Sequence, residues 1–138
     1  MGTPIDVGDM RVTFSRVAYA DSVEDRPTKA QIRPAVSGVF LVAYYSAENR
    51  GKERIVPGTA FNAKLAVYDK DGRRWEFADE LDKGNVSARF AIAAGGESPE
   101  RALGAGFSID TAVAFEVPSS ATGLCLPVGQ LRLLLPRP

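Results

Sequence analysis

Few side chains in this chain belong to the types that carry out acid–base, nucleophilic or metal chemistry. The chain has no histidine and a single cysteine, Cys125, so it lacks the commonest general base and the commonest transition-metal ligand. Zinc and copper sites built from several histidine and cysteine ligands are therefore excluded, and we expect no metal centre and no cofactor. Cys125 lies between Leu124 and Leu126, which predicts a small buried apolar side chain rather than a reactive thiol.

Carboxylates are the remaining side chains that could support catalysis. Six acidic residues lie in two polar stretches of the chain: Asp21, Glu24, Asp25, Asp79, Glu80 and Asp82. Acid–base hydrolysis needs two carboxylates at a fixed separation and in different environments, whereas carboxylates in polar loops are usually solvated charges. We therefore predict a protein that is not an enzyme, and keep a hydrolase that uses these loop carboxylates as the alternative.

Two further motifs have structural explanations that we prefer to chemical ones. The stretch DKDG, residues 69–72, contains a fragment of a calcium loop, but it runs into Arg73 and Arg74, whose charge opposes a cation. Asp and Gly tolerate the backbone angles of a tight turn, so we predict a hairpin turn here. Ser119 and Ser120 have no histidine to activate them as nucleophiles.

The length and the charge of the chain limit its organisation and its partners. Its 138 residues suit a single domain, 1–138, in which residues 1–9 are expected to form a flexible N-terminal segment. The 17 basic and 17 acidic residues balance, so a nucleic acid is not an expected partner. No apolar run approaches the roughly 18 residues that a membrane-spanning helix needs, so no membrane span is expected.

The elements that would position any site are short segments rich in β-forming residues, separated at short intervals by glycine and proline. This pattern predicts an all-β protein in which two antiparallel sheets pack face to face. The polar segment 21–37 is predicted to be a long loop, with room for a short edge strand. The predicted strands are 10–20, 39–48, 61–69, 73–77, 86–93, 108–118, 123–128 and 130–136. The register of 10–20 is expected to slip at a bulge. In 61–69, one face is predicted to carry Phe61, Ala63, Leu65 and Val67, and the other Asn62 and Lys64. The side chains predicted to fill the space between the sheets include Leu41, Ala43, Tyr45, Leu65, Val67, Trp75, Phe77, Val113, Phe115 and Val117.

The longest predicted strand, 39–48, has apolar residues on both of its faces. One set is predicted to point toward the core of the sandwich: Leu41, Ala43, Tyr45 and Ala47. The opposite set, Phe40, Val42 and Tyr44, continues into the polar Ser46 and Glu48. We therefore place the second set on the outward face, where its apolar side chains need a cover.

Two kinds of cover are open for this outward face. The explanation that we favour is internal: the 21–37 loop, with Ile32 and Val36, or the N-terminal segment folds across it. The alternative is a ligand or a second chain, and Phe40, Val42 and Tyr44 are then the binding residues. Tyr44 suits an interface because it has an apolar ring and a polar tip. The partner would be an unknown protein, or a second copy that forms a homodimer by sheet packing.

Three segments of the chain, 38–49, 65–77 and 103–126, carry the pattern of a known family. The residues of that pattern are Gly38, Phe40, Asn49, Asp71, Gly72, Trp75, Gly106, Phe115, Glu116, Val117 and Pro118. Over residues 10–135 the chain resembles the telokin-like domain of bacterial exported proteins, a group that includes a small secreted immunoprotective antigen. The family usually has Pro-Gly where this chain has Ala105-Gly106.

The resemblance implies an immunoglobulin-like antiparallel β-sandwich without an inter-sheet disulfide, which agrees with the single cysteine. It also implies a secreted or cell-envelope protein, with an export signal or lipid anchor before Met1. The family has no established catalytic residues, and most members are of unknown function. The resemblance thus implies a non-catalytic domain that binds a protein or another envelope component. A structural accessory domain of a larger envelope protein is the remaining alternative.

Overall fold

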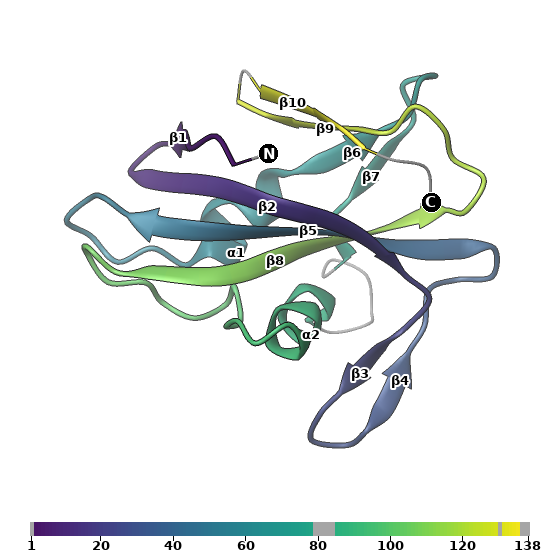
Figure 1. The fold of residues 1–138 in the computed structure, drawn as a ribbon, viewed down its shortest axis with the longest axis horizontal. Coiled ribbons are helices and arrows are strands. Elements are labelled where there is room, and N and C mark those ends of the chain that lie inside the picture. The colour runs from purple at the N-terminus through teal and green to yellow at the C-terminus, as the bar shows by residue number, and fades with distance from the viewer. Residues whose placement is uncertain (1, 79–84, 130, 136–138) are drawn as a thin grey trace.

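Two antiparallel sheets lie face to face in the computed structural model, which describes residues 2–78, 85–129 and 131–135 (Figure 1). The first sheet has the order β1-β2-β5-β8, with strands β1 (Ile5–Val7), β2 (Met10–Ala20), β5 (Gly38–Asn49) and β8 (Ser108–Pro118). The second has the order β10-β9-β6-β7, with strands β6 (Ala66–Tyr68), β7 (Arg74–Glu76), β9 (Cys125–Val128) and β10 (Leu131–Leu134). The predicted antiparallel β-sandwich is confirmed, and no disulfide joins the sheets because Cys125 is free.

Three long strands form the middle of the first sheet, and their register decides which side chains share a face. Tyr45 of β5 lies opposite Phe14 of β2 on one side and Thr111 of β8 on the other. The register of β2 shifts between Phe14 and Arg16, so Ser15 forms the β-bulge that the sequence predicted in this strand. Tyr45 and its two partners therefore project to the same face of the sheet.

The inner faces of the two sheets enclose the main apolar core. The ring centroid of Tyr45 lies 5.7 Å from that of Phe14 and 5.1 Å from that of Phe61. The ten residues predicted to fill the space between the sheets belong to this core, with Trp75 only partly buried at its margin: Leu41, Ala43, Tyr45, Leu65, Val67, Trp75, Phe77, Val113, Phe115 and Val117. Ala63, predicted to share a face with Leu65 and Val67, is instead exposed. Burial of each large side chain contributes about 1.5–3 kcal/mol, so this core drives the pairing of the sheets.

The segment VSARFAIA, predicted as a strand, is a helix, α2 (Val86–Ala93). Val86 and Ser87 in its first turn and Phe90 and Ala91 in its second are buried. This spacing places the four side chains on one side of a helix, whereas a strand would send neighbouring residues to opposite faces. The helix lies on the face of the first sheet that points away from the second sheet (Figure 1).

The strand predicted at 61–69 is also shorter than expected. Its first half belongs to the 3₁₀ turn η1 (Asn62–Lys64), which follows the short helix α1 (Pro57–Ala60), and β6 begins only at Ala66. Pro57 starts α1, a position that proline favours because its fixed φ suits a helix and its missing N–H would be unpaired there. Asn62, expected on the outer face, is fully buried as a result.

Short strands also occur in the segment predicted as a long loop with room for an edge strand and in the N-terminal segment. Residues 21–37 hold a hairpin, β3 (Val23–Asp25) and β4 (Ala30–Ile32), which projects from the sandwich (Figure 1). Residues 1–9, expected to be flexible, contribute strand β1, which pairs with β2.

Strand β8 is an edge of the first sheet, and other segments bond to its outward-facing polar groups. The Asn62 side-chain nitrogen donates to the Ala112 carbonyl at 3.0 Å. The Ala114 N–H donates to the Ser87 hydroxyl oxygen of α2 at 2.9 Å. Free N–H and C=O groups on an edge strand invite pairing with another chain, so these bonds protect β8 from such pairing.

Candidate functional site

The outward apolar face of β5, which the sequence offered as a binding surface, is covered by the chain itself. Phe40 is 0% exposed and Val42 is 1% exposed. The Phe90 ring of α2 meets the Phe40 ring edge-on, with centroids 5.6 Å apart, and Val23 of β3 packs in the same cluster. The expected internal cover is present in part: Val23 and the partly buried Ile32 of the 21–37 segment contribute, but Val36 is exposed, and α2 is the unpredicted main part of the cover. Phe40 and Val42 are therefore not surface binding residues, and this face is not available for sheet packing between two copies.

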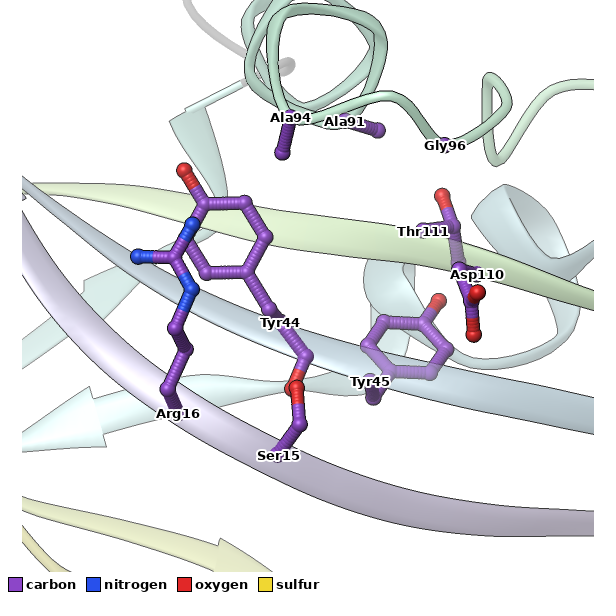
Figure 2. A pocket seen from close by; sticks show the side chains of 9 residues that line it. All are labelled: Ser15, Arg16, Tyr44, Tyr45, Ala91, Ala94, Gly96, Asp110 and Thr111. Atoms are coloured by element: carbon purple, nitrogen blue, oxygen red, sulfur yellow. The ribbon is translucent and has the colours of Figure 1, made fainter.

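Tyr44, the third residue of that face, is half-buried beside a crevice of about 150 Å³ (Figure 2). The guanidinium carbon of Arg16 lies 3.9 Å from the centroid of the Tyr44 ring, a cation–π contact. The Ser15 hydroxyl donates to the Tyr44 carbonyl at 3.2 Å, and Asp110 lines the opposite side of the crevice. Ligand pockets usually have volumes of about 300–1,000 Å³, so we assign no binding role to this crevice.

The acidic residues considered for hydrolysis divide into two groups. Asp79, Glu80 and Asp82 lie outside the described residues. In the other group the Asp25 carboxylate accepts a hydrogen bond from the Thr28 hydroxyl and lies 3.3 Å from the Arg89 guanidinium. That pair joins the projecting hairpin to α2, so Asp25 has a structural role.

The 69–72 turn is confirmed as the link between β6 and β7, and its first residue is held by its own loop. The buried Asp69 carboxylate accepts the N–H groups of Asp71 at 2.9 Å and Arg73 at 2.8 Å. It also pairs with the Arg73 guanidinium at 2.6 Å. Burial raises the pKa of the Asp69 carboxyl, but these hydrogen bonds and the Arg73 charge outweigh it, so the pKa lies below its ordinary value.

Cys125 and Ser119, the two candidate nucleophiles, have structural surroundings. Cys125 is half-buried on β9, more exposed than the fully buried side chain that we predicted. The Ser119 hydroxyl donates to the Ser37 carbonyl at 2.9 Å and so ties the end of β8 to the start of β5.

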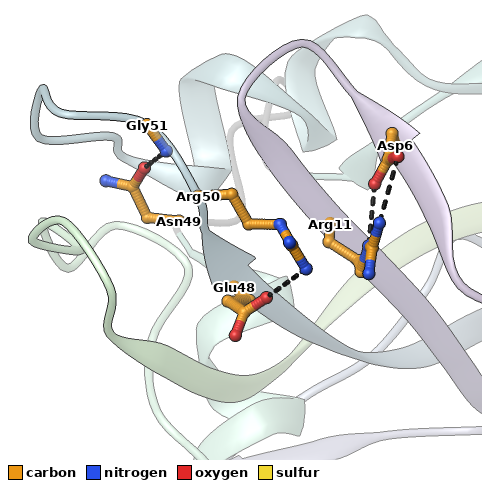
Figure 3. A network of polar contacts seen from close by, with 6 residues as sticks. All are labelled: Asp6, Arg11, Glu48, Asn49, Arg50 and Gly51. Carbon is orange, nitrogen blue, oxygen red and sulfur yellow. Dashed lines mark hydrogen bonds and ion pairs between the residues drawn. The ribbon is translucent and has the colours of Figure 1, made fainter.

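Asn49, the last residue of β5, is fully buried and joins two loops at one end of the sandwich. Its side-chain nitrogen donates to the Glu53 carbonyl at 2.7 Å and to the Leu103 carbonyl at 2.9 Å. Its side-chain oxygen accepts the Gly51 N–H at 3.0 Å (Figure 3). One side chain therefore ties the loop after β5 to the loop before β8.

Backbone hydrogen bonds hold the same two loops together. The N–H of Ile55 donates to the Leu103 carbonyl at 3.0 Å, and the Leu103 N–H donates back to the Ile55 carbonyl at 2.6 Å. The Gly106 N–H donates to the Asn49 carbonyl at 2.8 Å. Gly106 has a φ of +81°, which glycine adopts without the steric cost that other residues bear. The loops are thus fixed before any partner arrives.

A groove of about 360 Å³ is lined by residues of these two loops and of β8, and we call it the loop-end groove. Leu103 is 3% exposed and Ile109 is 9% exposed, so they form its floor. Phe107 also lines the groove and is 68% exposed. Large exposed aromatic side chains at a hollow are typical of protein interfaces.

Two arginines complete the lining of the loop-end groove. The Arg101 guanidinium pairs with the Glu97 carboxylate at 2.6 Å. Arg54 is exposed and has no hydrogen-bond or ion-pair partner within the described part of the chain. Its planar guanidinium therefore keeps all five N–H donors for solvent or a partner.

Two further hollows extend this groove along the surface. One, of about 350 Å³, shares Ser108 and Ile109 with the groove, and a second, of about 490 Å³, shares Glu48 with the first. The first hollow lies on the outer face of the β2-β5-β8 sheet and has a polar lining: Arg11, Thr13, Ser46, Glu48, Ser108 and Asp110. Because they share lining residues, the three hollows adjoin one another at this end of the molecule, and we call them together the concave surface.

Ion pairs border the polar part of this surface. Arg11 binds Asp6 at 2.8 Å, and Arg50 binds Glu48 at 3.3 Å (Figure 3). The hydrogen bond from Arg11 lowers the pKa of the Asp6 carboxyl. These four charges are paired, in contrast to Arg54.

Sequence reasoning found part of this surface and missed the rest. Asn49 and Gly106 belong to the family pattern, but that pattern did not give their structural role. Phe107 could have been noticed in the sequence, because it is an aromatic residue that follows Gly104 and Gly106 and directly precedes a predicted strand. Nothing in the sequence indicates a role for Arg54. Its place at the groove depends on the pairing of two loops that lie far apart in the chain.

Comparison with known proteins identifies the fold only. No protein-family model matches the chain, and no curated protein matches it. A conserved hypothetical protein from Bacillus anthracis superposes with a TM-score of 0.70 and 14% identity, over 97% of this chain and 92% of that chain. An uncharacterized β-sandwich protein from Clostridium difficile gives a TM-score of 0.60 and 10% identity, over 96% and 87% of the two chains. Both likenesses support the β-sandwich fold.

A secreted protein from Mycobacterium tuberculosis, MPT63, gives a TM-score of 0.49 and 12% identity, over 99% of this chain and 93% of that chain. This score is too low to support the fold assignment, which rests on the first two structures. Within the described residues, none of the helices is long and apolar enough to cross a membrane.

Proposed function

We propose that this chain is a non-catalytic domain, secreted or held in the cell envelope, that binds another protein through the loop-end groove. The observation that carries the proposal is the position of Phe107. This side chain is 68% exposed and lines the groove together with the buried Leu103 and Ile109. It shares the groove with Arg54, which has no partner among the residues that the structure describes. Aromatic residues and arginine are the side chains most enriched where proteins bind each other tightly.

The proposal of a non-catalytic role is supported by the side chains at the concave surface. The chain has no histidine, and the Asp6 and Glu48 carboxylates there are paired with arginines. General acid–base catalysis needs titratable groups that are held near a reacting atom and whose pKa values are tuned to the working pH. An acidic hydrolase is the rival proposal, and hydrolytic activity lost on substitution of Asp79, Glu80 or Asp82 would favour it.

The proposal of export is supported by the resemblance of segments 38–49, 65–77 and 103–126 to exported bacterial proteins. It is tested separately from binding. An antibody against the folded chain should detect it in the culture medium or envelope fraction of the source organism. Detection confined to the fraction that holds cytosolic enzymes would contradict export and leave the binding proposal standing.

Site-specific photo-crosslinking tests the binding role of the loop-end groove. Phe107 is replaced by the photo-reactive amino acid p-benzoylphenylalanine in the full chain, expressed in the source organism. A matched variant carries the same group in place of Val36, which is 99% exposed and lies in the segment between β4 and β5. Light should join one protein, identified by mass spectrometry, to position 107 and not to position 36. Equal adducts at both positions, or none at position 107, would count against the proposal.

A further inference from the structure

We infer that the loop-end groove binds an acidic segment of the partner protein, in which an apolar side chain lies next to a carboxylate. This inference rests on the proposed function, because it specifies what the same groove recognises. Three properties of the groove lead to it: a cation without a partner in the described part of the chain, an apolar lining with an exposed aromatic side chain, and an adjoining second hollow.

The charge of the groove favours an anion. Its lining contains two arginines, and only one of them has a carboxylate partner: Arg101 pairs with Glu97 at 2.6 Å. The remaining cation is Arg54, which has no partner among the described residues. A guanidinium binds a carboxylate through two parallel hydrogen bonds, which also fixes the orientation of the bound group. An Asp or Glu of the partner therefore completes the pairing of charges.

The apolar part of the groove favours a hydrophobic side chain next to that carboxylate. Leu103 and Ile109 lie on the floor and Phe107 stands at the side, exposed over 68% of its area. A partner side chain inserted here removes apolar surface from water on both molecules, which stabilises the complex in proportion to the buried area. An acidic segment with no apolar residue would leave Phe107 exposed and would bind less tightly.

The shape of the surface favours an extended peptide over a compact small molecule. The groove of about 360 Å³ continues through Ser108 and Ile109 into a polar hollow of about 350 Å³. Both hollows are open and lie side by side along the end of β8. The groove is also preorganised, because Asn49 and the Ile55–Leu103 pair fix the two loops. A fixed groove orders fewer of its own groups on binding, so more of the contact energy appears as affinity.

Selection from a random peptide library tests this inference with the full chain. The immobilised chain is used to enrich phage-displayed peptides, and the enriched sequences are made as synthetic peptides with a fluorescent label. Their affinities are measured by fluorescence polarisation for the wild type, Arg54→Ala and Phe107→Ala. Arg26→Ala and Val36→Ala are the matched controls, because both side chains are exposed and lie in the segment between β2 and β5.

We expect the enriched peptides to place Asp or Glu next to an aromatic or aliphatic residue. Arg54→Ala and Phe107→Ala should each weaken their binding by roughly tenfold or more, with the controls unchanged. Replacement of the peptide carboxylates by amides should weaken binding to the wild type and have little further effect on Arg54→Ala. Thermal melting of each variant confirms that it is folded.

The remaining outcomes separate this inference from the proposed function. Peptides without acidic residues whose binding still depends on Phe107 would overturn the inference and leave the binding role intact. Peptides indifferent to both substitutions, or no enrichment at all, would overturn both. Self-association of the chain that increases with concentration and is lost in Phe107→Ala would identify a second copy as the occupant, which also overturns the inference.

Discussion

The hydroxyl of Tyr45 donates a 2.6 Å hydrogen bond to the side-chain oxygen of Asn62 in the interior of the sandwich, and the Asn62 amide donates in turn to the Ala112 carbonyl. Asn62 thus connects the sheet core to the edge strand β8. Asn62→Ala should lower the free energy of unfolding by about 2–4 kcal/mol, because it removes one buried acceptor and one buried donor at once. Urea denaturation measures this change.

The neighbouring substitution Lys64→Ala is the control for Asn62→Ala. Lys64 belongs to the same 3₁₀ turn but is exposed, so its replacement should change stability by less than about 0.5 kcal/mol. Equal effects of the two substitutions would show that the buried hydrogen bonds contribute nothing measurable.

Thr111 lies opposite Tyr45 in the sheet register and is 2% exposed, and its hydroxyl has no hydrogen-bond partner among the described residues. An unsatisfied buried hydroxyl carries a desolvation cost that an apolar group of the same shape avoids. Thr111→Val should therefore leave stability unchanged or raise it by up to about 2 kcal/mol. The exposed-face counterpart Thr13→Val should give no gain. A clear loss of stability in Thr111→Val would contradict the prediction.

The strands and their faces could be predicted from the sequence because both are local properties. The alternation of apolar residues in β5 and β8 identified the inner residues, and the turn at 69–72 identified its hairpin. The bulge in β2 also followed from its irregular alternation.

The parts that the sequence missed depend on partners far away in the chain. The segment of α2 is short and mixed in composition, and it is stabilised as a helix by packing Phe90 on Phe40 of the distant strand β5. Asn62 looks like an outward polar residue until Tyr45 and Ala112 supply its hydrogen bonds. Arg54 joins the loop-end groove only through the pairing of Ile55 with Leu103.

Helix α2 stabilises the fold as the cover of the outer face of β5. Phe90 is 6% exposed and contacts Phe40 edge-on. Phe90→Ala should lower the free energy of unfolding by about 3–5 kcal/mol, because it creates a cavity and removes an aromatic pair. Ile92→Ala, on the same helix but 38% exposed, is the control and should have a much smaller effect. If Phe90→Ala lowers the free energy of unfolding no more than Ile92→Ala does, helix α2 is not part of the cooperative core.

The hairpin between β6 and β7 should depend on pH through Asp69. Burial raises the pKa of this carboxyl, but its hydrogen bonds with Arg73 and Asp71 outweigh that effect and lower the pKa from 3.8. A carboxyl whose pKa is lower in the folded state stabilises the protein above its ordinary pKa, and this contribution is lost as pH falls through the folded pKa. Asp69→Asn should therefore be less stable than the wild type at neutral pH.

The stability curves of the wild type and Asp69→Asn should converge in acid, below the ordinary carboxyl pKa of 3.8. Unfolding free energies from urea titrations over a pH series measure the difference. Asp71→Asn, which removes a charge from an exposed neighbour, controls for net charge. A difference between wild type and Asp69→Asn that stays constant with pH would rule out this carboxylate as the titrating group.

Asn49 should control the rigidity of the loop-end groove without touching a ligand, because its three side-chain hydrogen bonds end on backbone groups of Gly51, Glu53 and Leu103. In Asn49→Ala the two loops should open locally, so hydrogen exchange of the Gly51, Ile55 and Leu103 amides should accelerate more than exchange in the β2-β5 ladder. Asn49→Ala should also bind the selected acidic peptides less tightly, because the opened groove must then be ordered on binding. The exposed Lys52→Ala is the matched control in the same loop. Faster exchange spread evenly over all amides would instead assign Asn49 to global stability alone and remove it from the recognition of a partner.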